Sequence, residues 1–213
     1  AKSFLASGGG LATIAVRDEY IPLLAAKHPE VMLISHSKAL QQIDRFSVLV
    51  AGPGVEMLSA EEELLIKTFD KKIVADAGMF DILRHKETLF DGKTVVYTPH
   101  PGELKRFSDK KDLCWRALIE DFPLDKDCVL VAKNSATFVR YNDKRYILPY
   151  GAKALAFGGT GDALCGVMAM ALSQSHSVEH AVISALLIHR KAGLMLEEIF
   201  GSSAHQIEKL IDL

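Results

Sequence analysis

Short runs of β-branched and apolar residues alternate with helical patterns along the first two thirds of the chain, and this alternation restricts the fold more than any other feature. Six runs are expected to be strands: Leu11–Val16, Val31–Ile34, Ser47–Ala51, Lys72–Asp76, Thr94–Tyr97 and Cys128–Ala132. Several are apolar throughout, as is typical of parallel strands covered on both faces. The pattern predicts an α/β fold with a central, mostly parallel sheet and helices on both of its faces.

The helical segments lie between and after these strands. They are expected at Ala60–Phe69, Met79–His85, Glu103–Phe107 and Asp112–Asp121, and residues 160–213 are expected to be almost entirely helical. A hairpin is expected at Ala136–Tyr141 and Arg145–Leu148, with Asn142-Asp143-Lys144 as its loop. Residues 1–7 look like the last turns of a helix. The domain over residues 1–213 is therefore expected to lack the first strand and most of the first helix of such a fold.

The composition indicates a single globular domain. The chain has 213 residues, 49% of them apolar, which is enough for a sizeable core. Its 25 basic and 27 acidic residues give a net charge of -2, so neither nucleic acid nor an anionic membrane is indicated as a partner. Cys114, Cys128 and Cys165 are widely spaced and odd in number, and we expect buried free thiols. With no N-terminal signal pattern, a cytoplasmic location is the default.

A glycine-rich stretch leads directly into an apolar helical segment. It reads Gly158-Gly159-Thr160-Gly161-Asp162. Glycines let the backbone approach a ligand closely, and the first turn of a helix offers unpaired N–H groups to an anion. Two interpretations of Asp162 remain open. It is either an N-terminal cap of the helix or a general base beside a phosphate site.

Polar or glycine-containing turns follow four of the expected strands. They are Gly52-Pro53-Gly54, Asp76-Ala77-Gly78, Thr98-Pro99-His100-Pro101-Gly102-Glu103 and Lys133-Asn134-Ser135-Ala136-Thr137. Ligands of open parallel sheets bind beyond the carboxyl ends of the strands, so these turns predict a cleft for a phosphorylated ligand. Taken alone, Asp76 fits a metal-linked or a purely structural role equally well. The chain has no Walker A motif and no Rossmann glycine motif after the first strand, so nucleotide would be bound by another architecture.

Taken together, Gly52-Pro53-Gly54, the string from Thr98 to Glu103, Lys133–Thr137 and Gly159-Thr160-Gly161-Asp162 resemble the ADP/ATP-dependent NAD(P)H-hydrate dehydratases of the ribokinase-like superfamily. The order and spacing of these motifs match over nearly the whole chain. The resemblance implies a ribokinase-like fold and the repair of hydrated NADH or NADPH. In that reaction ADP or ATP drives the removal of water from the damaged nicotinamide ring.

The resemblance also implies roles for individual residues. Asp162 would be the base that acts on the ring hydroxyl, which is phosphorylated and then lost as phosphate. The hydrated dinucleotide would be bound by Gly52, Gly54, His100 and Asp162. The nucleotide would be bound by Lys133, Asn134, Ser135, Ala136, Thr137, Gly159, Thr160 and Gly161. Mg²⁺ would accompany the phosphates without a metal site built only from protein, and a homo-oligomer such as a tetramer is expected.

Two substitutions depart from the family's usual pattern. The family carries Asp-Ala-Asp where this chain has Asp76-Ala77-Gly78, and a Lys-Gly pair where it has Lys133-Asn134. Two other functions remain open. One is a ribokinase-like kinase that phosphorylates a small alcohol such as a vitamin precursor, using the same Asp162 chemistry. The other is a nucleotide-binding fragment without catalysis.

Overall fold

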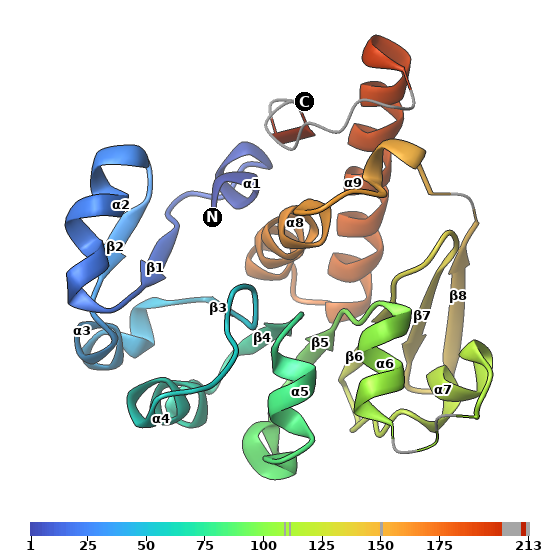
Figure 1. The fold of residues 1–213 in the computed structure, drawn as a ribbon, viewed down its shortest axis with the longest axis horizontal. Helices are drawn as coiled ribbons and strands as arrows, with labels where there is room; N and C mark the ends of the chain where they lie inside the picture. Colours follow the sequence, from blue (N-terminus) through green and yellow to red (C-terminus); the bar gives the residue numbers. More distant parts are fainter. Residues whose placement is uncertain (109, 111, 150, 202–209, 212–213) are drawn as a thin grey trace.

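A six-stranded sheet forms the centre of the molecule (Figure 1). The structure is a computed structural model that describes residues 1–108, 110, 112–149, 151–201 and 210–211. In sheet order the strands are β3 (Val48–Ala51), β4 (Lys72–Ala75), β5 (Val95–Tyr97), β6 (Val129–Ala132), β7 (Thr137–Tyr141) and β8 (Lys144–Leu148). The first four are parallel, and β7 and β8 add an antiparallel hairpin. The sheet is therefore mostly parallel, as predicted.

Helices cover both faces of this sheet (Figure 1). The helices on one face are α4 (Ala60–Thr68), α5 (Met79–Leu83), α6 (Pro101–Phe107) and α7 (Trp115–Asp121), and those on the other are α8 (Thr160–Gln174) and α9 (Val178–Phe200). Alternate residues of a strand point to opposite faces. Thus Ile73 and Ala75 pack with the first group, while Val74 packs with α8 and α9. The apolar strands of the sequence are apolar because each has two faces to bury.

The first two strands form a sheet of their own, which differs from the single sheet expected. β1 (Thr13–Ala15) and β2 (Met32–Ile34) pair in parallel with each other and with no other described strand. Their residues are largely half-exposed, and Met32 is 49% exposed. Because the two strands lack the doubly buried faces of β4 to β6, they do not extend the central core.

Several short helices were not expected from the sequence. They are α2 (Ile21–Lys27), α3 (His36–Gln41) and the 3-10 turns η1 (Asp18–Tyr20), η2 (Ile43–Arg45), η3 (Glu87–Phe90) and η4 (Lys153–Leu155). The expected helix end at the start of the chain is α1 (Lys2–Ala6), which packs against α8. Each unexpected helix spans at most two turns, which is too short for a clear apolar period.

The structure corrects two local predictions, on the hairpin loop and on Cys114, and describes only part of the region covered by a third. The hairpin loop has two residues rather than three, because Lys144 pairs with Tyr141 and Asn142 adopts the positive φ of 48° that a tight turn requires. Cys114 is exposed, whereas Cys128 and Cys165 are buried as expected, and all three are free thiols. The helical prediction for the end of the chain is confirmed by α8 and α9; residues 202–209 and 212–213 lie outside the described part.

Candidate active site

The glycine-rich stretch folds into the start of α8. Gly159 adopts a positive φ of 92° and precedes the first helical residue, which explains a glycine there. The Thr160 hydroxyl lies 2.8 Å from the Leu155 carbonyl oxygen and 2.9 Å from that of Phe157, so it closes the loop onto the helix. The helix therefore presents a fixed N-terminal turn in which Gly161 and Asp162 are the second and third residues.

Asp162 does not cap this helix. Its side chain is exposed in the first turn of α8, and it has no hydrogen-bond partner within the described part of the chain. Of the two interpretations left open by the sequence, N-terminal capping is therefore excluded. The carboxylate is free to accept a proton from a bound ligand.

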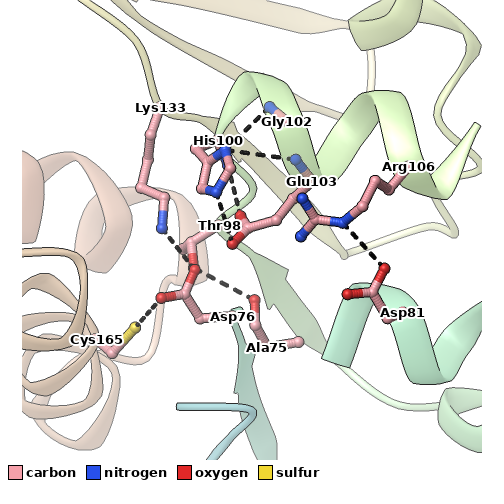
Figure 2. A network of polar contacts seen from close by, with 10 residues as sticks. All are labelled: Ala75, Asp76, Asp81, Thr98, His100, Gly102, Glu103, Arg106, Lys133 and Cys165. Carbon is pink, nitrogen blue, oxygen red and sulfur yellow. Dashed lines mark hydrogen bonds and ion pairs between the residues drawn. The ribbon is translucent and has the colours of Figure 1, made fainter. Parts of the chain in front are cut away.

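Behind this turn lies a buried carboxylate at the end of β4 (Figure 2). Asp76 is only 2% exposed. Its Oδ1 accepts hydrogen bonds from Lys133 Nζ at 2.6 Å and from Thr98 Oγ1 at 2.8 Å, and its Oδ2 accepts one from Cys165 Sγ at 3.3 Å. Burial raises the pKa of the Cys165 thiol well above its usual value, so the thiol stays protonated and can donate.

The Lys133–Asp76 ion pair lies directly against the first turn of α8. A Cβ atom placed on Gly161 would lie 3.4 Å from Lys133 Nζ and 3.7 Å from Asp76 Oδ2. Three elements distant in sequence, the ends of β4 and β6 and the start of α8, thus meet at one point. The site combines a cation, a helix N-terminus and an exposed carboxylate, which are the groups that bind and activate phosphoryl groups.

His100 caps helix α6 at the same edge of the sheet (Figure 2). Its Nδ1 accepts hydrogen bonds from the N–H groups of Gly102 at 2.9 Å and Glu103 at 3.4 Å, and its Nε2 lies 3.2 Å from Glu103 Oε1. The backbone N–H of His100 donates to Glu103 Oε2 at 2.7 Å, which completes a capping box. The His100 side chain remains 50% exposed, so it can also meet a ligand through its ring.

The Gly52-to-Gly54 turn packs against the backbone around Asp76. Gly52 has a φ of 117°, and a Cβ there would lie 1.7 Å from the Asp76 carbonyl oxygen. Gly78 also packs closely against this turn, because a Cβ on it would lie 1.7 Å from the Val55 carbonyl oxygen and 3.4 Å from that of Gly52. The glycine found where the family usually has its second acid is therefore required by this close backbone contact. Gly54 is exposed with a φ of 73°, and a Cβ on it would meet no described atom within 4 Å.

The residues after β6 form an exposed turn into β7. The Lys133 N–H donates to the Pro99 carbonyl oxygen at 2.8 Å, which joins this turn to the His100 turn. Asn134 Oδ1 accepts from the Ser135 N–H at 2.8 Å, and the Ser135 carbonyl accepts from the Gly151 N–H at 2.9 Å. Ala136 is half-buried and Thr137 is the first residue of β7. The side chains of Asn134 and Ser135 are exposed beside Lys133.

The sequence does not predict the roles of three residues at or beside this site. From the sequence, Asp76 fits a metal-linked or a structural role equally well, Cys165 is expected only to pack in the core, and His189 carries no prediction. The His189 side chain on α9 is half-buried, and its Nε2 atom is buried without a partner in the described residues. The ring also makes a hydrogen bond with the Thr160 backbone at the start of α8. An acid directly after an apolar strand was the available signal for Asp76. No sequence signal separated Cys165 or His189 from their apolar neighbours.

The described residues were also compared with the arrangements typical of metal sites and of membrane-spanning helices. Within the residues described, no group of three or more His, Cys, Asp or Glu side chains is arranged to hold a metal ion. Among the described helices, none combines the length and apolar character needed to cross a bilayer.

Comparison with known proteins gives the chain a family. The profile of the family described as NAD(P)H-hydrate dehydratase matches residues 1–212. An ADP-dependent (S)-NAD(P)H-hydrate dehydratase from Lactococcus lactis is 32% identical over 194 residues, which cover 86% of this chain and 70% of the relative. The enzyme of the same description from Listeria monocytogenes is 27% identical over 205 residues, covering 92% of this chain and 73% of the relative.

Solved structures share the fold. The ADP/ATP-dependent NAD(P)H-hydrate dehydratase from Bacillus subtilis, co-crystallised with ATP and Mg²⁺, superposes with a TM-score of 0.74 at 23% identity, covering 99% of this chain and 79% of that one. The hydroxyethylthiazole kinase from Pyrococcus horikoshii superposes with a TM-score of 0.66 at 15% identity, covering 95% of this chain and 86% of that one. The fold is thus ribokinase-like and shared with kinases, while the sequence match over residues 1–212 shows that this chain belongs to the NAD(P)H-hydrate dehydratase family.

Proposed function

We propose that this protein is an NAD(P)H-hydrate dehydratase that uses ADP or ATP as its phosphoryl donor. The observation that carries the proposal is the meeting of Lys133 with the first turn of α8, beside the exposed carboxylate of Asp162. The relatives described as dehydratases, which span most of the chain, support the choice of reaction. The proposal assigns residues 1–213 to one catalytic domain.

Phosphoryl transfer comes first. Asp162 takes the proton of the hydroxyl on the hydrated nicotinamide ring while the hydroxyl oxygen attacks the terminal phosphorus of the nucleotide. The bond between that phosphorus and its bridging oxygen breaks, and the nucleotide leaves as AMP from ADP or as ADP from ATP. Lys133 and the free N–H groups at the start of α8 stabilise the negative charge on the transferring phosphoryl oxygens. Asn134 to Thr137 and Gly159 to Gly161 line the nucleotide side of the site.

Elimination of phosphate follows. The bond between the ring carbon and its oxygen breaks, inorganic phosphate leaves, and loss of a proton from the neighbouring carbon restores the double bond of NADH or NADPH. The Gly52-to-Gly54 turn and His100 hold the dinucleotide, with the His100 ring fixed by the capping box of α6. Phosphate is a far better leaving group than hydroxide. The nucleotide therefore contributes by converting the ring hydroxyl into a better leaving group.

Mg²⁺ is proposed as the companion of the nucleotide phosphates. The chain offers one exposed carboxylate at the site, Asp162, and no complete protein cage among the described residues. This donor set fits an ion that takes most of its ligands from phosphates and water. When bound, the ion neutralises phosphate charge. We also propose a cytoplasmic location, which the free thiols Cys114, Cys128 and Cys165 support.

The test follows the absorbance band of reduced nicotinamide after the protein is mixed with hydrated NADH, Mg²⁺ and either ADP or ATP. The proposal predicts a rise in absorbance that depends on the nucleotide. Consumption of nucleotide with a small alcohol, and no rise with hydrated NADH, would instead identify a kinase. Binding of nucleotide without any turnover would identify a binding protein.

A further inference from the structure

The buried carboxylate of Asp76 is linked to three elements at once (Figure 2). Its partners are Lys133 at the end of β6, Thr98 after β5 and Cys165 on α8. Thr98 is completely buried and Asp76 is 2% exposed, whereas the Lys133 side chain is 20% exposed. The Lys133 ammonium group is therefore the partly exposed member of the pair, and the Asp76 carboxylate that binds it is buried.

Stability alone does not account for this arrangement. Removing two opposite charges from water costs about as much as their attraction returns, so a buried ion pair is weak evidence for stabilisation. The pair also lies 3.4 to 3.7 Å from the position of a Cβ on Gly161, in the first turn of α8. A fixed ammonium group at this point faces the place where negative charge develops during phosphoryl transfer.

We propose that Asp76 is a positioning residue for the proposed phosphoryl transfer, holding the Lys133 ammonium group beside the first turn of α8. The inference rests on the proposed function and extends it to a residue that does not touch the ligand. Thr98 and Cys165 donate to Asp76 and fix the orientation of its carboxylate. The carboxylate also offsets part of the lysine charge. Lys133 therefore binds the nucleotide less tightly in the ground state, which keeps the barrier to phosphoryl transfer low.

The inference predicts that binding and catalysis separate. In an Asp76→Asn variant Lys133 keeps its charge but loses its anchor. Nucleotide binding then becomes about two- to threefold tighter, because the lysine charge is no longer partly offset, while kcat falls by about tenfold or more, since misplacement of a group in the site affects the transition state most. A merely structural role would lower the melting temperature and leave kcat per folded molecule unchanged, and that result would overturn the inference.

A double-mutant cycle tests whether Asp76 acts through Lys133. The Lys133→Met variant has lower kcat and weaker nucleotide binding, and adding Asp76→Asn to it is expected to lower kcat by less than about twofold further, since the positioned group is gone. If the fold-decrease in kcat of the double variant equals the product of the decreases in the two single variants, Asp76 acts independently of Lys133. That result would contradict the inference. Asp143→Asn, in the turn at the opposite end of β7, serves as the matched control.

A second pair of variants applies if Asp76→Asn does not fold. Thr98→Val removes a donor to Asp76 with little change in shape, and Thr98→Ser keeps the hydroxyl. The inference predicts that kcat falls in the first variant and recovers in the second, with nucleotide affinity nearly constant in both. Equal kcat values in the two variants would overturn it.

The cycle also separates this inference from the proposed function. If the wild-type protein does not turn over hydrated NADH, the proposed function fails. The dissociation constant of ADP with Mg²⁺ then still tests the inference, because calorimetry requires no turnover. The Asp76→Asn effect on that constant should differ by at least about twofold between the wild-type and Lys133→Met backgrounds, as for other contacting residues. Equal effects in both backgrounds would refute the positioning of Lys133.

Discussion

Asp162 is the residue on which the proposed chemistry depends most. Its carboxylate is exposed and makes no hydrogen bond to described residues, so replacing it with asparagine breaks no hydrogen bond and removes only its electrostatic interaction with the Ala1 amino group. We expect Asp162→Asn to lower kcat by at least about 100-fold, the scale of a lost general base, with nucleotide affinity changed only a few-fold. Steady-state kinetics and calorimetry measure the two quantities.

The control for this variant is Asp143→Asn. Asp143 is also an exposed aspartate, but it lies in the β7–β8 turn, at the edge of the sheet away from Lys133. It should leave both kcat and affinity unchanged. An Asp162→Asn protein that is folded but no longer binds nucleotide would show that Asp162 serves in binding rather than as a base.

At the scale of elements, helix α6 depends on His100 for its N-terminal cap. Loss of the cap in His100→Ala should lower the free energy of unfolding by about 1 kcal/mol, and His100→Asn should recover most of it because asparagine is also a capping residue. If His100 also holds the substrate, KM for hydrated NADH should rise in both variants. Recovery of KM together with stability in His100→Asn would show that capping is its whole role. Chemical denaturation and steady-state kinetics provide the readouts.

The packing of α9 against α8 gives stability a pH dependence. Burial lowers the pKa of His189 to about 4, against a smaller, opposite effect of a hydrogen bond to the Thr160 backbone. The unfolded chain, with a pKa near 6.5, therefore binds more protons between about pH 4 and 6.5. Stability contributed by neutral His189 is complete above that window and is lost as the pH falls through it.

The measurement is the melting temperature at pH 7 and pH 5. His189→Gln removes the titrating group, so the wild-type protein should lose about 4 to 7 °C more than this variant on acidification. His180→Gln, at the exposed start of the same helix, is the control and should behave like wild type. An identical pH response in His189→Gln and wild type would contradict burial of a neutral His189.

The elements that the sequence predicted are those whose residues carry a strong local signal. The apolar strands β4 and β6 and the helix start at Gly159 follow from doubly buried faces and from a glycine with positive φ. The network around Asp76 could not be predicted, because it joins residues up to 89 positions apart, as in its bond with Cys165. The separate β1–β2 sheet depends on tertiary packing in the same way.

At the scale of the whole molecule, we propose that the protein is a homo-oligomer. Helix α9 exposes large apolar side chains in two pairs, and the members of each pair are about two or three turns apart, so that each pair lies on one side of the helix. They are Leu187, Ile188, Leu194 and Ile199, between 41% and 56% exposed. We expect a solution mass that is a multiple of 23.3 kDa by light scattering.

A double substitution tests whether this face forms the contact. Leu187→Glu with Leu194→Glu should reduce the mass toward that of a monomer, because the charges would have to be buried in the interface. Leu23→Glu, at an equally exposed leucine on α2, is the control and should leave the mass unchanged. A monomeric mass for the wild-type protein would contradict the proposal.

Oxygen labelling determines whether the ring hydroxyl is phosphorylated before it leaves the nicotinamide ring. Hydrated NADH whose ring hydroxyl carries ¹⁸O is converted in unlabelled water with ADP or ATP, and the inorganic phosphate is analysed by mass spectrometry. We expect one ¹⁸O atom in each phosphate released, because the oxygen that attacks phosphorus stays bound to it when the carbon–oxygen bond breaks. Unlabelled phosphate, with the ¹⁸O recovered in water, would contradict phosphoryl transfer to the substrate.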